Sequence, residues 1–214
     1  MYKPYVTLVE KLFPNAKLII DRFHIVQHIG RTFLMHRIQQ MNQLNRKEPQ
    51  EEQQYKHLKK YWKLLQKNAW HLEHQKQVWY ASFRAHLTES EDVDRLLSYS
   101  PELKQGYDVY QGFLSAIRTK DTEWLQELLA QNYHHLPEKY TTTIKTFKQY
   151  KKGILNALEQ PYSNGSLECM NNHIKVLKRN AYGFRSFYNF KLRILLTLGT
   201  TLFNPMKKKK HVEQ

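Results

Sequence analysis

The sequence predicts a mostly helical protein, and its composition carries that prediction. Glycine and proline, which interrupt helices, each occur only seven times in 214 residues. Lys, Gln, Glu and Leu, which favour helices, are abundant. Hydrophobic residues make up 41% of the chain, which is enough to build a core. Neither a disordered tail nor a turn-rich all-β fold is therefore expected.

The first segments read as a helix followed by a short strand. Apolar residues in "YKPYVTLVEKLF" recur at helical spacing, and Pro14 with Asn15 ends the pattern. The stretch "AKLIID" then places β-branched and apolar residues in one run, which predicts a buried strand ending at Asp21. Together these elements suggest a piece of an α/β layer.

From Arg22 onward the spacing of apolar residues is helical almost throughout. A long helix is predicted first, with a buried stripe along Phe23, Val26 or Gln27, Gly30, Phe33, Leu34, Ile38 and Met41. After a polar break at "NRKEPQ", the stretch "EEQQYKHLKKYWKLLQKN" predicts a second helix. No repeat and no sustained heptad pattern is found, so the helices are expected to pack as an irregular bundle.

Capping residues mark where two later helices begin. Thr88 with Glu91 has the spacing of a capping box. Ser100 precedes a proline at the first helical position. Helices are therefore predicted at 89–98 and 101–117.

The rest of this region also reads as helical. Asp121 can cap a short helix, and "LPEKYTTTIKTFKQYKKGILNALEQ" predicts a further long one. Most of the tryptophans are expected to be core or partly buried, with the alternative that one is exposed to stack on an unpaired base; they are Trp62, Trp70, Trp79 and Trp124.

The charge balance indicates a polyanionic partner. Lys and Arg number 34 against 19 Asp and Glu, and the formal net charge is +15. Nucleic acid is the leading partner on this ground, although many basic proteins bind nothing specific. No apolar run approaches the ~20 residues of a membrane span, and the N-terminus lacks the layout of a signal peptide. A soluble, cytoplasmic protein without a membrane partner is expected.

Cysteine and histidine usage argues against a structural metal. The single cysteine, Cys169, excludes an internal disulfide and a zinc site built on a cysteine pair. His24 and His28 have the spacing of helical metal ligands but lack the neighbouring Glu of a zincin motif. No structural zinc is expected.

One carboxylate stands alone in a long basic stretch. Glu168 is the sole Asp or Glu between Gln160 and Val212, an interval that holds ten Lys and Arg residues. The loop "PYSNG" precedes it, and Ser163 or Asn164 can cap a helix there. In that helix Leu167, Met170, Ile174 and Leu177 form the apolar side, while Glu168, Asn172, Lys175 and Arg179 form a polar stripe.

Two interpretations of this lone acid stay open. An acidic residue near a helix N-terminus is stabilised by the helix dipole, by about 0.3 to 1 kcal/mol. Alternatively, a carboxylate that holds a divalent metal, beside cations that bind phosphates, is the layout of a phosphoryl-transfer site on DNA. Aromatic residues alternate with bases in "KVLKRNAYGFRSFYNFKLR", which suits contact with nucleic acid, although some of these rings must be core.

Three stretches carry a resemblance to a known family. They are "MYKPYVTLVEKLFPNAKLIIDRFHIVQH", "KKYWKLL" and "PYSNGSLECMNNHIKVLKRNAYGFRSFYNFKLRILL". The chain resembles the carboxyl-terminal part of DDE transposases of the ISL3 family of bacterial insertion sequences. The resemblance implies a mostly α chain in which the remnant of a ribonuclease-H-like α/β core is interrupted by a large all-helical insertion. It also implies Mg²⁺-dependent DNA cleavage and strand transfer by two aspartates and one glutamate.

Site residues follow from the motifs that match. Glu168 in "SNGSLECMNN" matches the third catalytic acid, a metal ligand. Asp21 and His24 in "DRFH" match a D-x-x-H signature that supports the site. The two catalytic aspartates and the amino-terminal DNA-binding regions of the family have no counterpart in this sequence. The resemblance therefore implies a truncated or frameshifted transposase that is inactive alone.

The same resemblance divides the chain into four parts. Residues 1–27 are the partial core, 28–160 the helical insertion, 161–204 the carboxyl-terminal core helices with the catalytic Glu, and 205–214 a basic tail. Because the insertion carries its own apolar stripes, it is expected to fold without residues 1–27. Side chains expected to bind DNA are Asn172, Lys175, Lys178, Arg179, Arg185 and Arg193.

Three functional hypotheses follow. The first is an inactive transposase fragment that keeps a surface for transposon-end DNA and one metal ligand. The second is a catalytically dead protein that occupies transposon DNA, or joins full-length transposase or another copy of itself, and inhibits transposition. The third is a helical nucleic-acid-binding protein unrelated to transposition.

Overall fold

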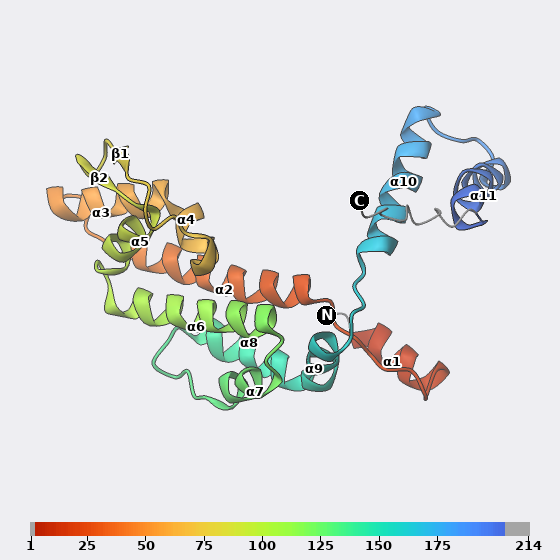
Figure 1. The fold of residues 1–214 in the computed structure, drawn as a ribbon, viewed down its shortest axis with the longest axis horizontal. Coiled ribbons are helices and arrows are strands. Elements are labelled where there is room, and N and C mark those ends of the chain that lie inside the picture. Colours follow the sequence, from red (N-terminus) through yellow and green to blue (C-terminus); the bar gives the residue numbers. More distant parts are fainter. Residues whose placement is uncertain (1–2, 204–214) are drawn as a thin grey trace, which may run out of the picture. The chain divides into compact units, whose positions relative to one another are not determined.

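The computed structural model describes residues 3–203, and two compact units divide the chain, Met1–Tyr162 and Ser163–Gln214. The predicted mostly helical fold is confirmed (Figure 1). The helices of the first unit are α1 (Lys3–Leu12), α2 (Arg22–Gln43), α3 (Pro49–Lys60), α4 (Trp62–Gln66), α5 (Glu89–Leu97), α6 (Pro101–Thr119), α7 (Thr122–Ala130), α8 (Glu138–Gln149) and α9 (Lys151–Glu159).

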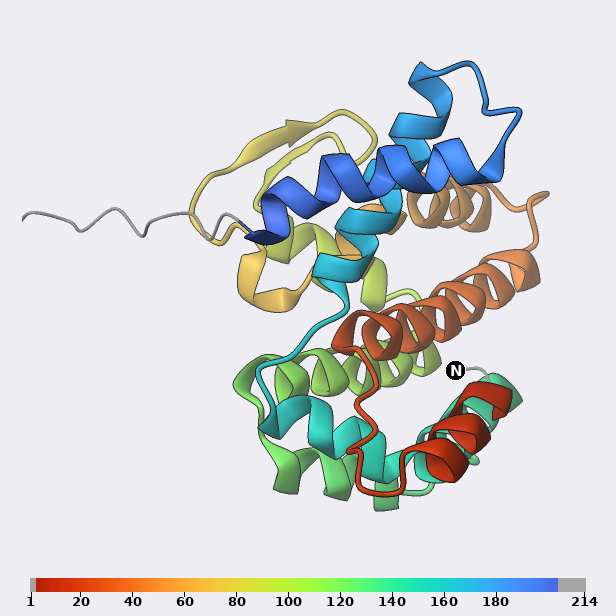
Figure 2. The same ribbon diagram turned by 90° about the vertical axis from the view of Figure 1, so that its right-hand side faces the viewer.

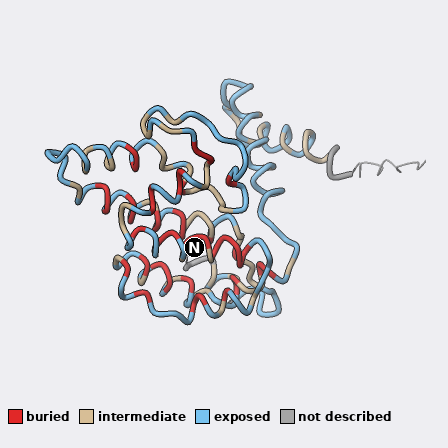
Figure 3. The backbone as a smooth tube through the Cα atoms, turned by 60° about the vertical axis from the view of Figure 1, so that its left-hand side comes forward, coloured by how far each residue is buried: buried red, intermediate tan, exposed pale blue. Residues whose placement is uncertain are grey.

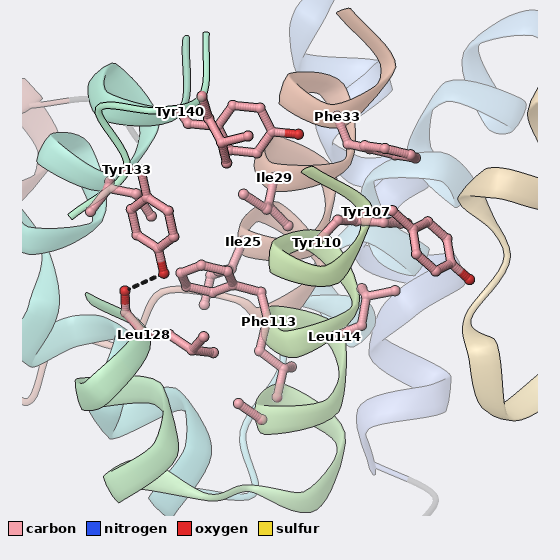
Figure 4. Close-up of a cluster of buried hydrophobic side chains, with 14 of the residues drawn as sticks. Ile25, Ile29, Phe33, Tyr107, Tyr110, Phe113, Leu114, Leu128, Tyr133 and Tyr140 are labelled. Atoms are coloured by element: carbon pink, nitrogen blue, oxygen red, sulfur yellow. Dashed lines mark hydrogen bonds between the residues drawn. The ribbon is translucent and has the colours of Figure 1, made fainter. Parts of the chain in front are cut away.

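The core of the first unit lies between α2 and α6, which run side by side (Figures 1 and 2). Figure 4 shows Ile25, Ile29 and Phe33 of α2 directed toward α6, with spacings of four residues that keep them on one face. The Phe33 ring stacks on that of Tyr110, with centroids 5.2 Å apart and planes 10° apart. Each such buried side chain contributes about 1.5 to 3 kcal/mol to folding.

The buried face of α2 is rotated from the predicted one. Gly30, Phe33 and Met41 are buried as expected, but Phe23 and Ile38 are exposed. Polar residues take part of the face instead, and the buried Arg37 donates from Nη1 to the Leu58 carbonyl at 2.6 Å. Because these polar groups find partners on other helices, hydrophobicity alone could not identify them.

The predicted caps are confirmed. Thr88 and Glu91 form the full capping box, with the Thr88 amide donating to Glu91 Oε2 at 2.8 Å and the Glu91 amide donating to Thr88 Oγ1 at 3.2 Å. Ser100 accepts from the Leu103 amide at 3.1 Å. Asp121 caps α7. Helices α5 and α6 begin at the predicted residues.

Two predicted helices are broken in the structure. The second predicted helix divides at Tyr61 into α3 and α4, and the predicted helix over 136–160 divides at Tyr150 into α8 and α9. Both tyrosines leave helical geometry, with φ near −100° and ψ near +18°, and these values set a new direction for the following helix. Neither break contains proline or glycine, so no sequence signal marked them.

The predicted strand ending at Asp21 is not formed. Residues 16–21 are extended but pair with no other strand among residues 3–203. Instead this segment lies against α9, where the Ile20 amide donates to the Gly153 carbonyl at 3.0 Å and Asn156 Nδ2 donates to the Leu18 carbonyl at 2.8 Å. An extended run needs a neighbouring strand to become part of a sheet.

A small β-hairpin was not predicted. Strands β1 (Val78–Tyr80) and β2 (Ala85–Leu87) are antiparallel, with Trp79 opposite His86. Arg84 takes a left-handed conformation with φ of 50° in the turn between them. Three-residue strands are too short to show the alternation on which a strand prediction rests.

Most tryptophans were expected to be core or partly buried, but three of the four are exposed. Trp70 is 64% exposed and Trp79 53% exposed, while Trp124 is also at the surface and Trp62 is half-buried. Trp70 keeps a polar contact, because its Nε1 donates to Ser115 Oγ at 3.3 Å. The amphipathic indole can lie at a surface in this way.

The second unit consists of two helices, α10 (Gly165–Asn180) and α11 (Phe187–Phe203). None of its described side chains is fully buried, as the pale and tan colours of Figure 3 show. The rings of Phe184 and Phe190 pack together at 4.8 Å where the two helices meet. Across residues 3–203, no helix is both long and apolar enough to cross a membrane.

Candidate nucleic-acid interface

Helix α10 begins where the sequence predicted, after the loop at 161–164. Asn164 is the N-cap residue, and its carbonyl accepts from the Glu168 amide at 3.0 Å. Its side chain does not form the expected cap, whereas Ser163 Oγ accepts weakly from the Gly165 amide at 3.4 Å. This start places Glu168 in the first turn, near the positive end of the helix dipole.

The predicted polar stripe lies on one exposed face of α10. Glu168, Asn172, Lys175 and Arg179 follow one another at intervals of three or four residues, and all are exposed. Met170, Ile174 and Leu177 are half-buried on the apolar side, but Leu167 is 57% exposed. The stripe therefore offers an acid, an amide and two cations to solvent in that order.

The cations of the second unit have no acidic partners in the described part of the chain. The two ion pairs found between residues 3 and 203 join Lys56 to Glu52 and Lys67 to Glu89, both in the first unit. Between Cys169 and Phe203 the sequence contains no Asp or Glu at all. Cations without an acidic partner keep more of their attraction for a polyanion, and Glu168 is the one carboxylate on the described helices of this unit.

A tight turn carries the basic surface from α10 to α11. The Tyr182 and Gly183 amides donate to the Arg179 and Lys178 carbonyls at 2.9 and 3.1 Å, which closes the helix end. Both residues have positive φ, 51° at Tyr182 and 100° at Gly183. The value at Gly183 is one that glycine adopts readily and other residues rarely do, so glycine is needed at that position. The Tyr182 side chain is fully exposed beside these bases.

The remaining predicted DNA-binding residues are also exposed. Lys178 is on α10, Arg185 on the connection, and Arg193 on α11. The prediction omitted Lys191, which is exposed on α11 as well. Of the aromatic residues between these bases, Phe187 is exposed whereas Phe184 and Phe190 are half-buried.

Asp21 and His24 lie in the first unit, at the start of α2. Asp21 is the N-cap of this helix, and its Oδ1 accepts from the Phe23 amide at 2.8 Å. His24 is exposed one turn further, with its ring 5.8 Å from that of Phe23. Asp21 thus has a structural role that accounts for an acid at this position.

No assembled metal site is present in the described residues. Among residues 3–203, no three His, Cys, Asp or Glu side chains come together as metal ligands. Glu168 is a single exposed carboxylate, and Mg²⁺ is commonly bound by one or two carboxylates together with substrate phosphates. The carboxylate of Glu168 therefore fits as one ligand of such an ion, with further ligands required.

Helix α10 exposes one carboxylate and a row of cations, a charge pattern also found on the phosphate-binding surfaces of proteins that act on nucleic acids. The chain belongs to the ISL3-type DDE transposase family, because the family model described as transposase matches residues 1–194. The recognition from sequence is thereby confirmed.

Two curated relatives bear on this membership. The chain is 27% identical over 199 residues to the transposase for insertion sequence element IS1001 of Bordetella parapertussis, a match that covers 91% of this chain and 45% of that protein. It is 59% identical over 118 residues to a protein of Lactococcus lactis subsp. lactis named ATP-dependent protease, covering 55% of this chain and 38% of that protein. The chain thus spans less than half the length of both relatives. No solved structure matches it.

The name of the second relative does not change the family. That name describes a whole protein of which this chain matches 38%, whereas the transposase model matches nearly the whole of this chain. A name given to the longer protein cannot be assigned to the part that is shared.

Proposed function

We propose that this chain is a part of an ISL3-type transposase that retains a DNA-binding surface, and that Glu168 is one of the metal-binding carboxylates used in DNA cleavage and strand transfer. The observation that carries the proposal is the exposed stripe of α10, where Glu168 is followed by Asn172, Lys175 and Arg179 with no competing acid on the helix. Phosphates held by the two cations would lie along the same face as the carboxylate.

The metal in this proposal is Mg²⁺. A pair of such ions stabilises both the attacking and the leaving oxygen in phosphoryl transfer when several carboxylates hold them. Glu168 supplies one carboxylate, and the two aspartates that the family resemblance implies have no counterpart in this sequence. We therefore propose that the chain is inactive alone and that activity requires those acids on the same polypeptide.

The proposed division of the chain follows the family. Residues 1–27 and 161–204 would belong to a ribonuclease-H-like core, residues 28–160 to the helical insertion, and 205–214 to a basic tail, which lies outside the described residues. Asp21 would act as a positioning residue, since its carboxylate fixes the first turn of α2 and with it His24. We place the protein in the cytoplasm, where the transposon DNA is.

A second role rests on the same surface. A chain that binds transposon ends but cannot cut them would compete with intact transposase, so an inhibitor of transposition is the alternative. Association with full-length transposase or with a second copy would strengthen that inhibition. The exposed apolar side chains of α11, such as Leu195 and Leu196, leave surface for such contacts.

DNA binding tests the proposal directly. Lys175→Ala and Arg179→Ala should each weaken binding about equally on unrelated duplexes, and each should reduce the log-log salt slope by about one unit. Lys59→Ala removes an exposed cation from α3 and is the matched control. Fluorescence anisotropy over a salt series measures both quantities. An unchanged slope in both α10 variants would remove the stripe from the DNA interface.

A further inference from the structure

The outer face of α8 carries a row of three lysines and one threonine that no sequence motif identified. Lys139, Thr142, Lys145 and Lys148 are exposed at intervals of three residues, and they are called the α8 ridge below. Tyr140, Ile144 and Phe147 are buried on the opposite side and fix the rotation of the helix. The ridge therefore faces solvent because the core holds the other face.

A groove runs along one flank of the ridge, between α2 and α8. It consists of two adjoining hollows of 450 and 290 Å³ that share Met35 and Lys139. The first is lined by the apolar Met35, Ile38 and Pro137 together with the amides Gln39, Asn42 and Gln43, and the second has Arg31 and Thr142 in its lining. Its floor is closed by the hydrogen bond between the hydroxyls of Thr32 and Thr143 at 2.7 Å.

A third hollow lies on the other flank of the ridge. It has a volume of 340 Å³ and is lined by Lys145 and Lys148 of α8 together with Gln131, Asn132 and His134 of the preceding loop. The ridge is thus bordered on both sides by recesses with amide and cationic side chains. Amides and hydroxyls can donate hydrogen bonds to phosphate oxygens, and lysine and arginine add charge.

Acidic side chains are few in this part of the surface, and the nearest one in sequence is Glu138, exposed at the start of α8. No Asp or Glu lines any of the three hollows in the described chain. The sequence has no acid from Arg22 to Gln43, which is all of α2, and none between Glu138 and Glu159. Burial lowers the pKa of His28 in the groove, with help from the nearby charge of Arg31, so this ring stays neutral near pH 7. The positive charge therefore comes from Arg31 and the lysines.

We propose that the α8 ridge and its two flanking recesses form a second DNA-binding surface, which contacts the phosphate backbone of a duplex independently of α10. This proposal depends on the proposed function in one respect, which is that DNA is taken as the polyanion that binds. From Lys139 to Lys148 the ridge covers ten residues, about 13.5 Å of helix, or about four base-pair steps of 3.4 Å.

Duplex rather than single-stranded DNA fits this surface. Proteins that bind unpaired strands stack successive bases on exposed aromatic rings. Among the described residues, Tyr133 is the one Phe, Tyr or Trp that lines the three hollows, and it is buried with its hydroxyl donating to the Leu128 carbonyl at 2.7 Å. Without an exposed ring to stack on, the ridge reads backbone charge and not bases.

The test compares two triple variants of the whole chain that lose the same charge. Lys139→Gln/Lys145→Gln/Lys148→Gln neutralises the ridge, and Lys59→Gln/Lys63→Gln/Lys76→Gln neutralises exposed lysines of the first unit outside the three hollows. Circular dichroism establishes that both variants fold as the parent does. Anisotropy over a salt series with a short duplex of arbitrary sequence then gives the slope for each.

The ridge variant should lower the log-log salt slope by about two to three units, since each lost phosphate contact removes about 0.9. The control variant should leave the slope nearly unchanged. Equal slopes for the ridge variant and the parent, or an equal loss in the control, would overturn the proposal. A ridge variant that loses affinity for polyglutamate but not for duplex would overturn it in favour of an acidic protein partner.

The α10 stripe is tested in the same series, so that the two proposals can fail separately. Lys175→Gln/Arg179→Gln removes the stripe cations and leaves the ridge intact. A loss in the ridge variant alone would support the α8 surface and contradict the α10 interface. A lower salt slope in the stripe variant alone would support the α10 interface and contradict the α8 surface. Absence of salt-dependent DNA binding by the parent chain would contradict both proposals.

Discussion

The hydroxyl oxygens of Thr32 and Thr143 lie 2.7 Å apart in the buried interface between α2 and α8, although 111 residues separate them in sequence. Thr32 also donates to the His28 carbonyl at 3.2 Å. A polar pair at this depth fixes how α8 sits on α2, since an unpaired hydroxyl in the interior is unfavourable. The same pair closes the floor of the groove that flanks the α8 ridge.

Removal of both hydroxyls should cost less stability than the sum of the two single removals. Thr143→Val leaves the Thr32 hydroxyl with only its bond to the His28 carbonyl and should lower the unfolding free energy by about 1 kcal/mol. Thr32→Val/Thr143→Val removes both groups at nearly constant shape, so its loss should be smaller than the sum of the single losses. Urea denaturation of the parent and the three variants gives the coupling. Additive losses would show that the two hydroxyls do not interact.

A close approach at Gly106 makes a second prediction. A Cβ built there would lie 2.6 Å from the Tyr140 hydroxyl and closer still to His36 Nδ1, and both side chains are buried. These groups hydrogen-bond each other at 3.3 Å and cannot withdraw. Gly106→Ala should therefore destabilise the fold by about 1 to 3 kcal/mol.

The control for this substitution is Gly30→Ala on α2. A Cβ at Gly30 meets Tyr110 at 3.6 Å, an ordinary contact distance. Alanine at a helical position is favoured over glycine by about 0.5 to 1 kcal/mol, so this variant should be as stable as the parent or more so. Thermal unfolding of both variants checks the contrast. Equal melting temperatures would contradict the packing at Gly106.

Stability should depend on pH through Asp92. This carboxyl is fully buried on α5, and neither of its oxygens has a hydrogen-bond partner in the described chain. Burial raises its pKa from the ordinary 3.8 to about 7, against the opposing influence of Arg95 and Lys60. The folded protein thus holds this proton more tightly than the unfolded chain does, and the resulting stabilisation is complete below about pH 4 and lost as pH rises through about 7.

The matched variant for this effect is Asp92→Asn. Relative to that variant, the unfolding free energy of the parent should fall between about pH 4 and pH 7, by at most about 1.4 kcal/mol per unit of pKa shift. Taking the difference cancels the buried His28, His36 and His57, whose pKa values burial lowers and whose effect has the opposite sign. A difference that does not change with pH would show that Asp92 is ionised normally.

The amino-terminal segment matters more for stability than the sequence indicated. The insertion from residue 28 was expected to fold without residues 1–27, but Ile20 and Ile25 of that segment are buried in the core. By contrast α1 exposes Leu8 and Leu12. Deletion of residues 1–15 should leave the melting temperature of the first unit nearly unchanged, whereas deletion of 1–27 should lower it strongly, because buried side chains are lost.

Circular dichroism melts of the two shortened chains measure this contrast. The loss of helical signal at low temperature must first be corrected for the deleted residues. If the 1–27 deletion melts as the 1–15 deletion does, residues 16–27 contribute nothing to the core and the independent-insertion hypothesis is restored.

Local signals in the sequence predicted the features that depend on local chemistry. The capping box at Thr88, the N-cap at Ser100 and the stripe on α10 need only residues three or four positions apart, and all three are present. The breaks at Tyr61 and Tyr150 depend instead on which distant helices the flanking segments pack against. No pattern within a single helix specifies that choice.

The candidate site shows the same division. Which side chains of α10 share a face followed from helical periodicity, and the structure places them as expected. The α8 ridge was not predicted, because its lysines lie among threonines and match no motif. The sequence does show that no acid occurs between Glu138 and Glu159. Its flanking groove depends on α2, more than a hundred residues earlier, so only the fold could reveal it.

Glu168 alone should not support cleavage or strand transfer. Two-metal phosphoryl transfer requires carboxylates that bridge and flank ions about 3.5 to 4 Å apart, and a single exposed carboxylate cannot arrange them. Asp21 caps α2 through its Oδ1, and the family resemblance gives it a supporting role and not that of a metal ligand. The purified chain should therefore neither cut nor join transposon-end DNA with Mg²⁺ or Mn²⁺, while still binding it.

The informative comparison joins this chain to the aspartate-bearing segment of a full-length relative. In that longer protein Glu168→Gln should abolish strand cleavage, since it removes a charge that the metal needs at nearly constant shape. Binding to the same DNA without divalent metal should be retained or slightly stronger, because one repulsion from phosphate is lost. Asn171→Ala, at an exposed neighbouring position, is the control and should keep activity. Divalent-dependent nicking by the present chain, lost in Glu168→Gln, would refute inactivity and yet assign the metal to this carboxylate.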